Sequence, residues 1–166
     1  YAEWLGRIRY VPAITYLQEA AGHDLDYHMK TAAAKSLGFM GSEAWDSTPT
    51  LCSLLMATED LDVRLVTINA LGSIGNPKAS VALRNIYELA QSEINECTEE
   101  NLGPYEALLR DSLIALFKVD KELAQTLVSE AQWGRNSGIR HFSRNARRFS
   151  LGKKYLNTDL ILPFQK

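Results

Sequence analysis

A cluster of histidines and aspartates contains the first residues of this chain that could do chemistry. His23, Asp24, Asp26 and His28 place two imidazoles and two carboxylates close together in the sequence. A metal site needs such ligands to converge at a fixed geometry. The stretch also has the pattern of a turn that leads into a helix, where a carboxylate caps unpaired backbone amides. We therefore interpret Asp24 and Asp26 as capping residues and expect no metal there.

A basic stretch near the C-terminus is the second candidate. It runs from Arg135 to Lys154 and contains no aspartate or glutamate. Several of its arginines follow the spacing of one broad helical face, which would suit an anionic partner such as nucleic acid. The anion-binding residues would be Arg140, Arg144, Arg147, Arg148, Lys153 and Lys154. The sequence favours instead a solvated terminal helix that caps the acidic body of the chain and pairs with it, and anion binding is the alternative.

Patterns typical of covalent catalysis are missing from the sequence. It contains no Gly-x-Ser-x-Gly motif, and neither cysteine belongs to a Cys-x-x-Cys pair. Cys52 and Cys97 fall in helical patterns, so we expect reduced thiols that are buried or half-buried. The sequence therefore predicts no catalytic residue, no cofactor and no enzymatic activity.

Length and composition are those of one folded domain with an uneven charge. Of the 166 residues, 46% are hydrophobic and 23% are charged, which allows a core without disulfides or metal. Residues 1–132 hold 10 Lys/Arg and 19 Asp/Glu (net −9), and residues 133–166 hold 8 and 1 (net +7), which gives −2 in total. No apolar run approaches the roughly 20 residues that span a membrane, and we expect a cytoplasmic protein. Because the sequence starts at Tyr1 rather than Met, we also expect a fragment of a larger chain or complex.

An internal helical repeat is the most informative feature of the chain. Residues 62–75 carry apolar side chains at the i, i+3/i+4, i+7 spacing of an amphipathic helix. Residues 29–41 align with residues 63–75 at a constant offset of 34. The alignment pairs Asp26 with Asp60, Leu37 with Leu71, Gly38 with Gly72, and Gly41 with Gly75. Repeats of this length are typical of stacked helix pairs.

Further helices are predicted on both sides of this repeat. After Pro77, which can open a helix, the apolar pattern resumes with Val81, Leu83, Ile86, Tyr87, Leu89 and Ala90. The other predicted helices span residues 2–8, 11–20, 104–117 and 123–128. Residues 41–48 are predicted to form an enlarged turn, and residues 93–103 a polar connection.

The motif around residue 70 resembles a known repeat family. Asp60-x-x-Val63-Arg64, followed by Ala70-Leu71-Gly72-x-Ile74-Gly75-Asn76-Pro77-x-Ala79, is similar to a HEAT repeat, in particular to the HEAT-like form of phycobilisome lyase subunits. The resemblance extends over roughly residues 10–131. It implies an all-α solenoid, a right-handed superhelix of about four antiparallel helix pairs. It also implies that the Asp and Arg bridge neighbouring repeats and that Ala and Gly let helices approach closely.

These observations define the expected organisation. Residues 1–132 form the HEAT-like array, and residues 133–166 form a basic capping helix and an apolar tail within the same domain. The predicted core residues are Ala34, Leu37, Leu71, Ile74, Ile86, Leu113 and Leu116.

The expected function is that of a non-catalytic scaffold for protein–protein interaction. The resemblance implies that the second helix of each pair lines a concave surface, which would hold a protein partner through Gln18, Trp45, Ser53, Arg84 and Glu88. Trp4, Trp45 and Trp133 are interpreted as packing anchors, with Trp45 the most exposed of them to a partner. The alternatives are nucleic-acid or polyanion binding through the basic segment, and a lyase-subunit role in tetrapyrrole attachment.

Overall fold

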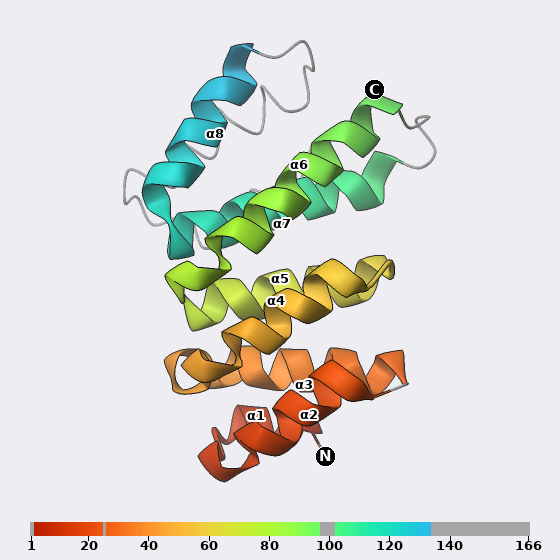
Figure 1. Ribbon diagram of the computed structural model, residues 1–166, viewed down its shortest axis with the longest axis vertical. Coiled ribbons are helices and arrows are strands. Elements are labelled where there is room, and N and C mark those ends of the chain that lie inside the picture. The colour runs from red at the N-terminus through yellow and green to blue at the C-terminus, as the bar shows by residue number, and fades with distance from the viewer. Residues whose placement is uncertain (1, 25, 97–101, 134–166) are drawn as a thin grey trace. The chain divides into compact units, whose positions relative to one another are not determined.

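The fold is all-helical, as the sequence predicts. The computed structural model describes residues 2–24, 26–96 and 102–133, and each regular element in these ranges is a helix (Figure 1). In order, the elements are α1 (Ala2–Arg7), η1 (Val11–Ala13), α2 (Ile14–His23), α3 (Tyr27–Met40), η2 (Gly41–Ser47), α4 (Thr48–Ala57), α5 (Leu61–Ile74), η3 (Pro77–Ala79), α6 (Ser80–Glu96), α7 (Leu102–Val119) and α8 (Lys121–Trp133), where η marks a 3₁₀ helix. The chain divides into two compact units, Tyr1–Ala124 and Gln125–Lys166. In the described ranges no helix is both long enough and apolar enough to cross a membrane.

The first unit contains two rows of helices. Helices α1, α3, α5 and α7 pack side by side in one row, and α2, α4 and α6 follow one another in the second row (Figure 1). Each second-row helix packs most closely against the first-row helix that follows it in sequence: α2 on α3, α4 on α5 and α6 on α7. The sequence predicted closer pairing across the short turn that precedes each second-row helix. A 3₁₀ segment stands in each of those turns: η1, η2 and η3.

Local signals fix the helix ends as predicted. The side chain of Asp26 accepts the N–H of His28 and so caps α3, and Asp60 caps α5 by accepting the N–H groups of Asp62 and Val63. Gly75 ends α5 in the left-handed region at φ 75°, where glycine has no Cβ to clash.

Close contacts between small residues set the spacing of the first row. A Cβ added to Gly38 would lie 2.9 Å from Ala70 Cα, and one added to Gly72 would lie 2.9 Å from Ala115 Cβ. A Cβ on Gly6 would lie 2.5 Å from Ser36 Cα. All three distances are below any normal carbon–carbon contact, so α1, α3, α5 and α7 can approach this closely only because glycine stands at these positions. The expected close approach of helices through Gly and Ala is therefore present at each interface of the row.

The predicted core is confirmed. Each predicted core side chain is at most 3% exposed: Ala34, Leu37, Leu71, Ile74, Ile86, Leu113 and Leu116. Ser36 is also fully buried, and its hydroxyl donates to the carbonyl oxygens of Ala2 (2.7 Å) and Ala32 (2.6 Å), so it joins α1 to α3 without leaving a polar group unsatisfied.

Three expectations about individual segments were wrong. Val81 (67% exposed) and Leu89 (36% exposed) do not belong to the core stripe of α6, because Ala82, Leu83, Ile86, Tyr87 and Ala90 occupy the side that faces the core. Residues 93–96 continue α6 rather than forming a connection.

The third concerns Trp4, which is 62% exposed instead of serving as a packing anchor. Gly6 and Glu3 occupy the side of α1 that faces α3, where Gly6 meets Ser36 and Glu3 meets Lys35. Trp4 therefore points away from α3, since it lies two residues from Gly6, which is about 200° around the helix.

Candidate protein-binding face

The solvent side of the second row is the candidate site. Its exposed side chains come from α2, α4 and α6, on the helix sides that point away from the core. We call this surface the second-helix face and define it by Glu19, Ser53, Met56, Val81, Arg84 and Glu88.

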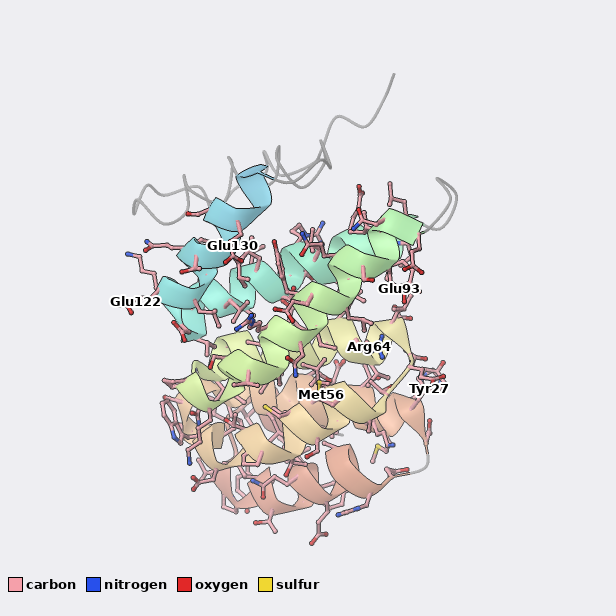
Figure 2. The ribbon with its side chains drawn as sticks, turned by 45° about the horizontal axis from the view of Figure 1, so that its top comes forward. Tyr27, Met56, Arg64, Glu93, Glu122 and Glu130 are labelled. Atoms are coloured by element: carbon pink, nitrogen blue, oxygen red, sulfur yellow. The ribbon has the colours of Figure 1, made fainter. Side chains whose placement is uncertain are left out.

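Helix α4, in the middle of the row, gives this face an uncharged centre. The helix contains no Asp, Glu, Lys, Arg or His. Leu51, Leu54 and Leu55 are buried on its core side, and the opposite side exposes Ser53 and Met56, of which Met56 is 51% exposed (Figure 2). Methionine is flexible and polarisable and adapts to varied apolar partners.

Helix α6 adds one apolar residue and one ion pair to the face. Val81 is 67% exposed at the start of the helix. One and two turns further on, Arg84 Nε and Glu88 Oε1 lie 2.7 Å apart in an i, i+4 pair, each about half exposed. An exposed pair of this kind adds little to folding stability. Because both side chains are about half exposed, a partner can reach their charges.

Gln18 and Trp45 lie next to this face but are used partly for packing. Gln18 is half-buried, and its Nε2 donates to Ser47 Oγ (2.9 Å), which joins α2 to η2. The Trp45 ring is 43% exposed. Its carbonyl oxygen accepts from Thr48 Oγ1 (2.8 Å) and from the buried Asn76 Nδ2 (3.2 Å), which ties η2 to the start of η3.

Cys52, on α4, is the one cysteine in the described part of the chain. It is half-buried and free, as expected, and burial raises the pKa of its thiol. A raised pKa lowers the fraction of thiolate, which is the nucleophilic form. The thiol is thus poorly suited to catalysis. Cys97 lies outside the described residues.

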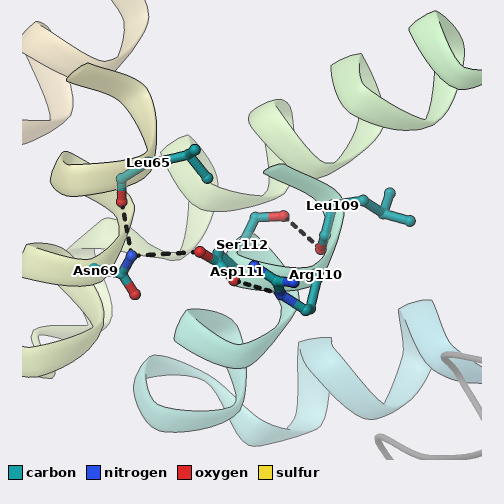
Figure 3. Close-up of polar contacts among 6 residues, drawn as sticks. All are labelled: Leu65, Asn69, Leu109, Arg110, Asp111 and Ser112. Atoms are coloured by element: carbon teal, nitrogen blue, oxygen red, sulfur yellow. Dashed lines mark hydrogen bonds and ion pairs between the residues drawn. The ribbon is translucent and has the colours of Figure 1, made fainter. Parts of the chain in front are cut away.

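The first row differs from this face because its polar side chains link neighbouring helices. Asn69 Nδ2 on α5 donates to Leu65 O (3.0 Å) and to Asp111 Oδ2 on α7 (3.4 Å), and Arg110 Nε lies 2.8 Å from the other oxygen of Asp111 (Figure 3). These side chains stabilise the packing of α5 against α7.

A second ion pair joins the first two helices of the row. Lys35 Nζ lies 2.6 Å from Glu3 Oε1 and donates a hydrogen bond to it. That hydrogen bond and the positive charge of Lys35 lower the pKa of Glu3. The link joins α1 to α3.

The predicted Asp–Arg bridge between repeats takes another form. Asp60 caps its own helix, and Arg64 Nε donates to Thr58 O (2.9 Å) in the turn between α4 and α5. Both contacts are local to one helix start. The lateral links are instead made by the Glu3–Lys35 and Asn69–Asp111 pairs described above.

The structure places the predicted site residues in two groups. Ser53, Arg84 and Glu88 lie exposed on second-row helices, and Gln18 and Trp45 lie at the joints between elements. Sequence reasoning missed Met56 and Val81. Val81 was assigned to the apolar pattern after Pro77, and Met56 was not considered. A helical wheel centred on Leu51, Leu54 and Leu55 would have placed Met56 on the outer side.

The predicted anion-binding residues, from Arg140 to Lys154, lie outside the described residues, as does the side chain of Trp133. In the His23–His28 stretch, Asp24 Oδ1 accepts the N–H of Asp26 (2.9 Å) and Asp26 Oδ1 accepts the N–H of His28 (2.9 Å). The predicted capping role is therefore confirmed for Asp26, whereas Asp24 accepts a hydrogen bond within the turn before the helix.

The fold and this face define a helical protein whose solvent-facing second row has an uncharged central helix, α4. Compared with known protein families and with curated proteins, the sequence of the chain matches none.

Proposed function

We propose that residues 1–124 form a HEAT-like solenoid that binds a protein partner along the second-helix face and carries out no catalysis. Two rows of helices, an offset of 34 residues between α3 and α5, and small-residue contacts along the first row support the HEAT-like arrangement.

The absence of charge on α4 is the observation that carries the proposal. Residues 1–132 contain 29 charged side chains, 10 Lys/Arg and 19 Asp/Glu, yet none falls on this exposed helix. The centres of protein interfaces are depleted in charge and enriched in methionine and aromatic residues. An uncharged helix with an exposed methionine, between two helices that carry charge, matches that pattern.

The residues of the face have distinct roles under this proposal. Met56 and Val81 would be the apolar anchors, because truncation of a few central side chains removes most of the affinity of a typical interface. Arg84 and Glu88 would lie at the rim, where charge affects orientation and association rate more than affinity.

Site-specific photocrosslinking tests the proposal. A photoreactive phenylalanine derivative is introduced at Ser53 on the second-helix face or at Ser73, a serine on α5 that is also exposed. Each full chain is irradiated in a lysate of cells that express the protein, with and without nuclease. We expect protein adducts from position 53 that resist nuclease, and none of them from position 73.

Charge substitutions provide the second arm. Met56→Arg should abolish the adduct formed from position 53, and Ser73→Arg should leave it unchanged. Equal adducts from both positions would contradict the proposal. Adducts that disappear with nuclease would favour the alternative of nucleic-acid binding through the basic segment, and adducts that survive Met56→Arg would exclude this face as the binding surface.

A further inference from the structure

A second group of exposed apolar side chains comes from the N-terminal elements of the first unit. Trp4 (62% exposed) and Ile8 (49%) come from α1 and the turn after it, Tyr10 (50%) and Val11 (49%) from that turn and η1, and Tyr16 (54%) from α2. We call these five residues the N-terminal end face. Its three aromatic rings alone expose on the order of 300 Å². Apolar patches of that size are often functional.

The geometry of α1 and α2 shows that these side chains point out of the row. On α1, Gly6 and Glu3 face α3, so Trp4 lies on the opposite side. On α2, Gln18 faces η2 through its bond to Ser47. Tyr16 precedes Gln18 by two residues, which is about 200° around a helix, and so points away from η2.

Trp4 also breaks the pattern of small residues along the first row. Each glycine of the row packs against a small residue of the next helix. Gly6 packs against Ser36 of α3, Gly38 against Ala70 of α5, and Gly72 against Ala115 of α7. Ser36 and Ala70 each stand two residues before the glycine of their own helix, and the same position in α1, two residues before Gly6, is occupied by Trp4. A large aromatic there suits an anchor for a partner rather than close packing of another glycine-bearing helix.

Arg9 provides an independent observation beside this surface. It is the one non-glycine residue with positive φ (52°) in the described part of the chain. It ends α1 with the hydrogen bonds Arg9 N→Gly6 O (3.0 Å) and Tyr10 N→Leu5 O (3.0 Å), a helix end at which glycine is the preferred residue. The ends of α3 and α5 do have glycine, with positive φ at Gly41 and Gly75. An exposed arginine in a backbone conformation that favours glycine indicates that its side chain is used.

The charge around the end face indicates what kind of partner could bind there. Residues 2–19 contain Arg7, Arg9 and two acids, Glu3 and Glu19, and Lys35 pairs with the Glu3 carboxylate at 2.6 Å, so these five charged side chains sum to +1. No described residue forms an ion pair with Arg9. This end is therefore locally positive, whereas residues 1–132 as a whole carry a net charge of −9. Two copies meeting head to head would bring like charges together, which disfavours self-association.

We propose that the N-terminal end face binds an acidic protein segment whose apolar side chains pack on Trp4 and Tyr16 and whose carboxylates pair with Arg9. Arginine and aromatic side chains are the residues most enriched among those that dominate binding energy. The proposal does not depend on the second-helix face, because Trp4 and Arg9 lie on α1 and in the turn after it.

Selection from a random peptide library tests this proposal. Phage-displayed peptides about five helical turns long are selected on the full chain, with the Trp4→Ser chain as a competitor in solution. We expect the enriched peptides to combine Asp or Glu with apolar residues, and to bind the Trp4→Ser chain at least about tenfold more weakly. No enrichment over the competitor, or enrichment of peptides without acidic residues, would overturn the proposal.

Arg9→Gly separates binding from folding. The variant should bind the selected peptide roughly threefold to tenfold more weakly, while its Tm stays equal or rises by about 1–3 °C because the strained backbone is relieved. Unchanged affinity would refute the role of Arg9. Met56→Arg is the matched control, and peptide binding must survive it. Sedimentation velocity tests whether a second copy of the chain binds the end face instead. If the full chain forms a dimer that Trp4→Ser dissociates, the choice of a separate acidic partner is refuted.

Discussion

Replacing Gly72 with alanine should destabilise the protein, although alanine is the better helix former. In an open helical position this change gains about 1 kcal/mol. Here the new Cβ would lie 2.9 Å from Ala115 Cβ and 3.1 Å from Ala115 Cα. Overpacking of this kind costs about 1–3 kcal/mol, and both close atoms belong to Ala115, which has no flexible side chain that could move aside. The overpacking cost should lie in the upper part of that range, because two helix backbones must separate. After the gain in helix propensity is subtracted, we expect a net loss of about 1–2 kcal/mol in the free energy of unfolding.

A double-mutant cycle tests the cause of that loss. Ala115→Gly removes the nearest atom, so the pair Gly72→Ala/Ala115→Gly should be more stable than the sum of the single changes predicts, by about 1–2 kcal/mol. The equivalent pair between α3 and α5, Gly38 with Ala70, should be rescued less well. There the nearest atom is Ala70 Cα at 2.9 Å, which the substitution Ala70→Gly leaves in place.

The assay is urea unfolding of the full chain, followed by far-UV circular dichroism. Gly103→Ala is the matched control, because it lies in α7 with nothing within 4 Å of its added Cβ. It should gain up to about 1 kcal/mol. A Gly72→Ala chain as stable as the unmodified protein, or coupling below about 0.5 kcal/mol in the cycle, would refute the conclusion that glycine sets the spacing of the first row.

Three further predictions follow from single contacts. Asn76→Asp keeps the capping acceptor but loses the buried donor to Trp45 O, so it should lower the free energy of unfolding by about 1–3 kcal/mol in the same urea assay; no loss would show that this link is dispensable. Lys35→Met should raise the pKa of Glu3 toward its ordinary value of 4.5 in an NMR titration. Because the lowered pKa belongs to the folded state, the stabilisation is present above pH 4.5 and is lost as pH falls through the folded pKa, so the Lys35→Met variant should lose less stability on acidification. With the other cysteine replaced by serine, Cys52 should react with a thiol reagent more slowly in the folded chain than in urea at mildly alkaline pH, since its raised pKa reduces the thiolate; equal rates would contradict this.

Helix positions could be predicted from the sequence because their signals are local. Asp60 accepts amides two and three residues ahead of it, and Gly75 ends its helix through its own backbone conformation. The repeat alignment also predicted that Gly38 and Gly72 are equivalent. It could not identify Ala70 and Ala115 as the residues they meet, because the contact between two helices depends on their packing geometry.

The candidate site was less predictable because its residues depend on distant partners. Gln18 was expected on an open surface, but its amide reaches Ser47, 29 residues away, and is half-buried as a result. Trp4 was expected to pack, because no local pattern reveals which side of a short helix faces its neighbour. Val81 was placed on the wrong side of α6 because an error of one residue rotates a helical wheel by about 100°.

The glycine contacts of the first row also bear on how the chain folds. Gly6 and Ser36 are 30 positions apart, Gly38 and Ala70 are 32 apart, and Gly72 and Ala115 are 43 apart. Closing these loops differs in entropy cost by only about 0.3 kcal/mol. Each interface can therefore form soon after its own residues leave the ribosome, without waiting for the rest of the sequence. During synthesis the row would assemble from α1 toward α7, so that little apolar surface is exposed at any one time.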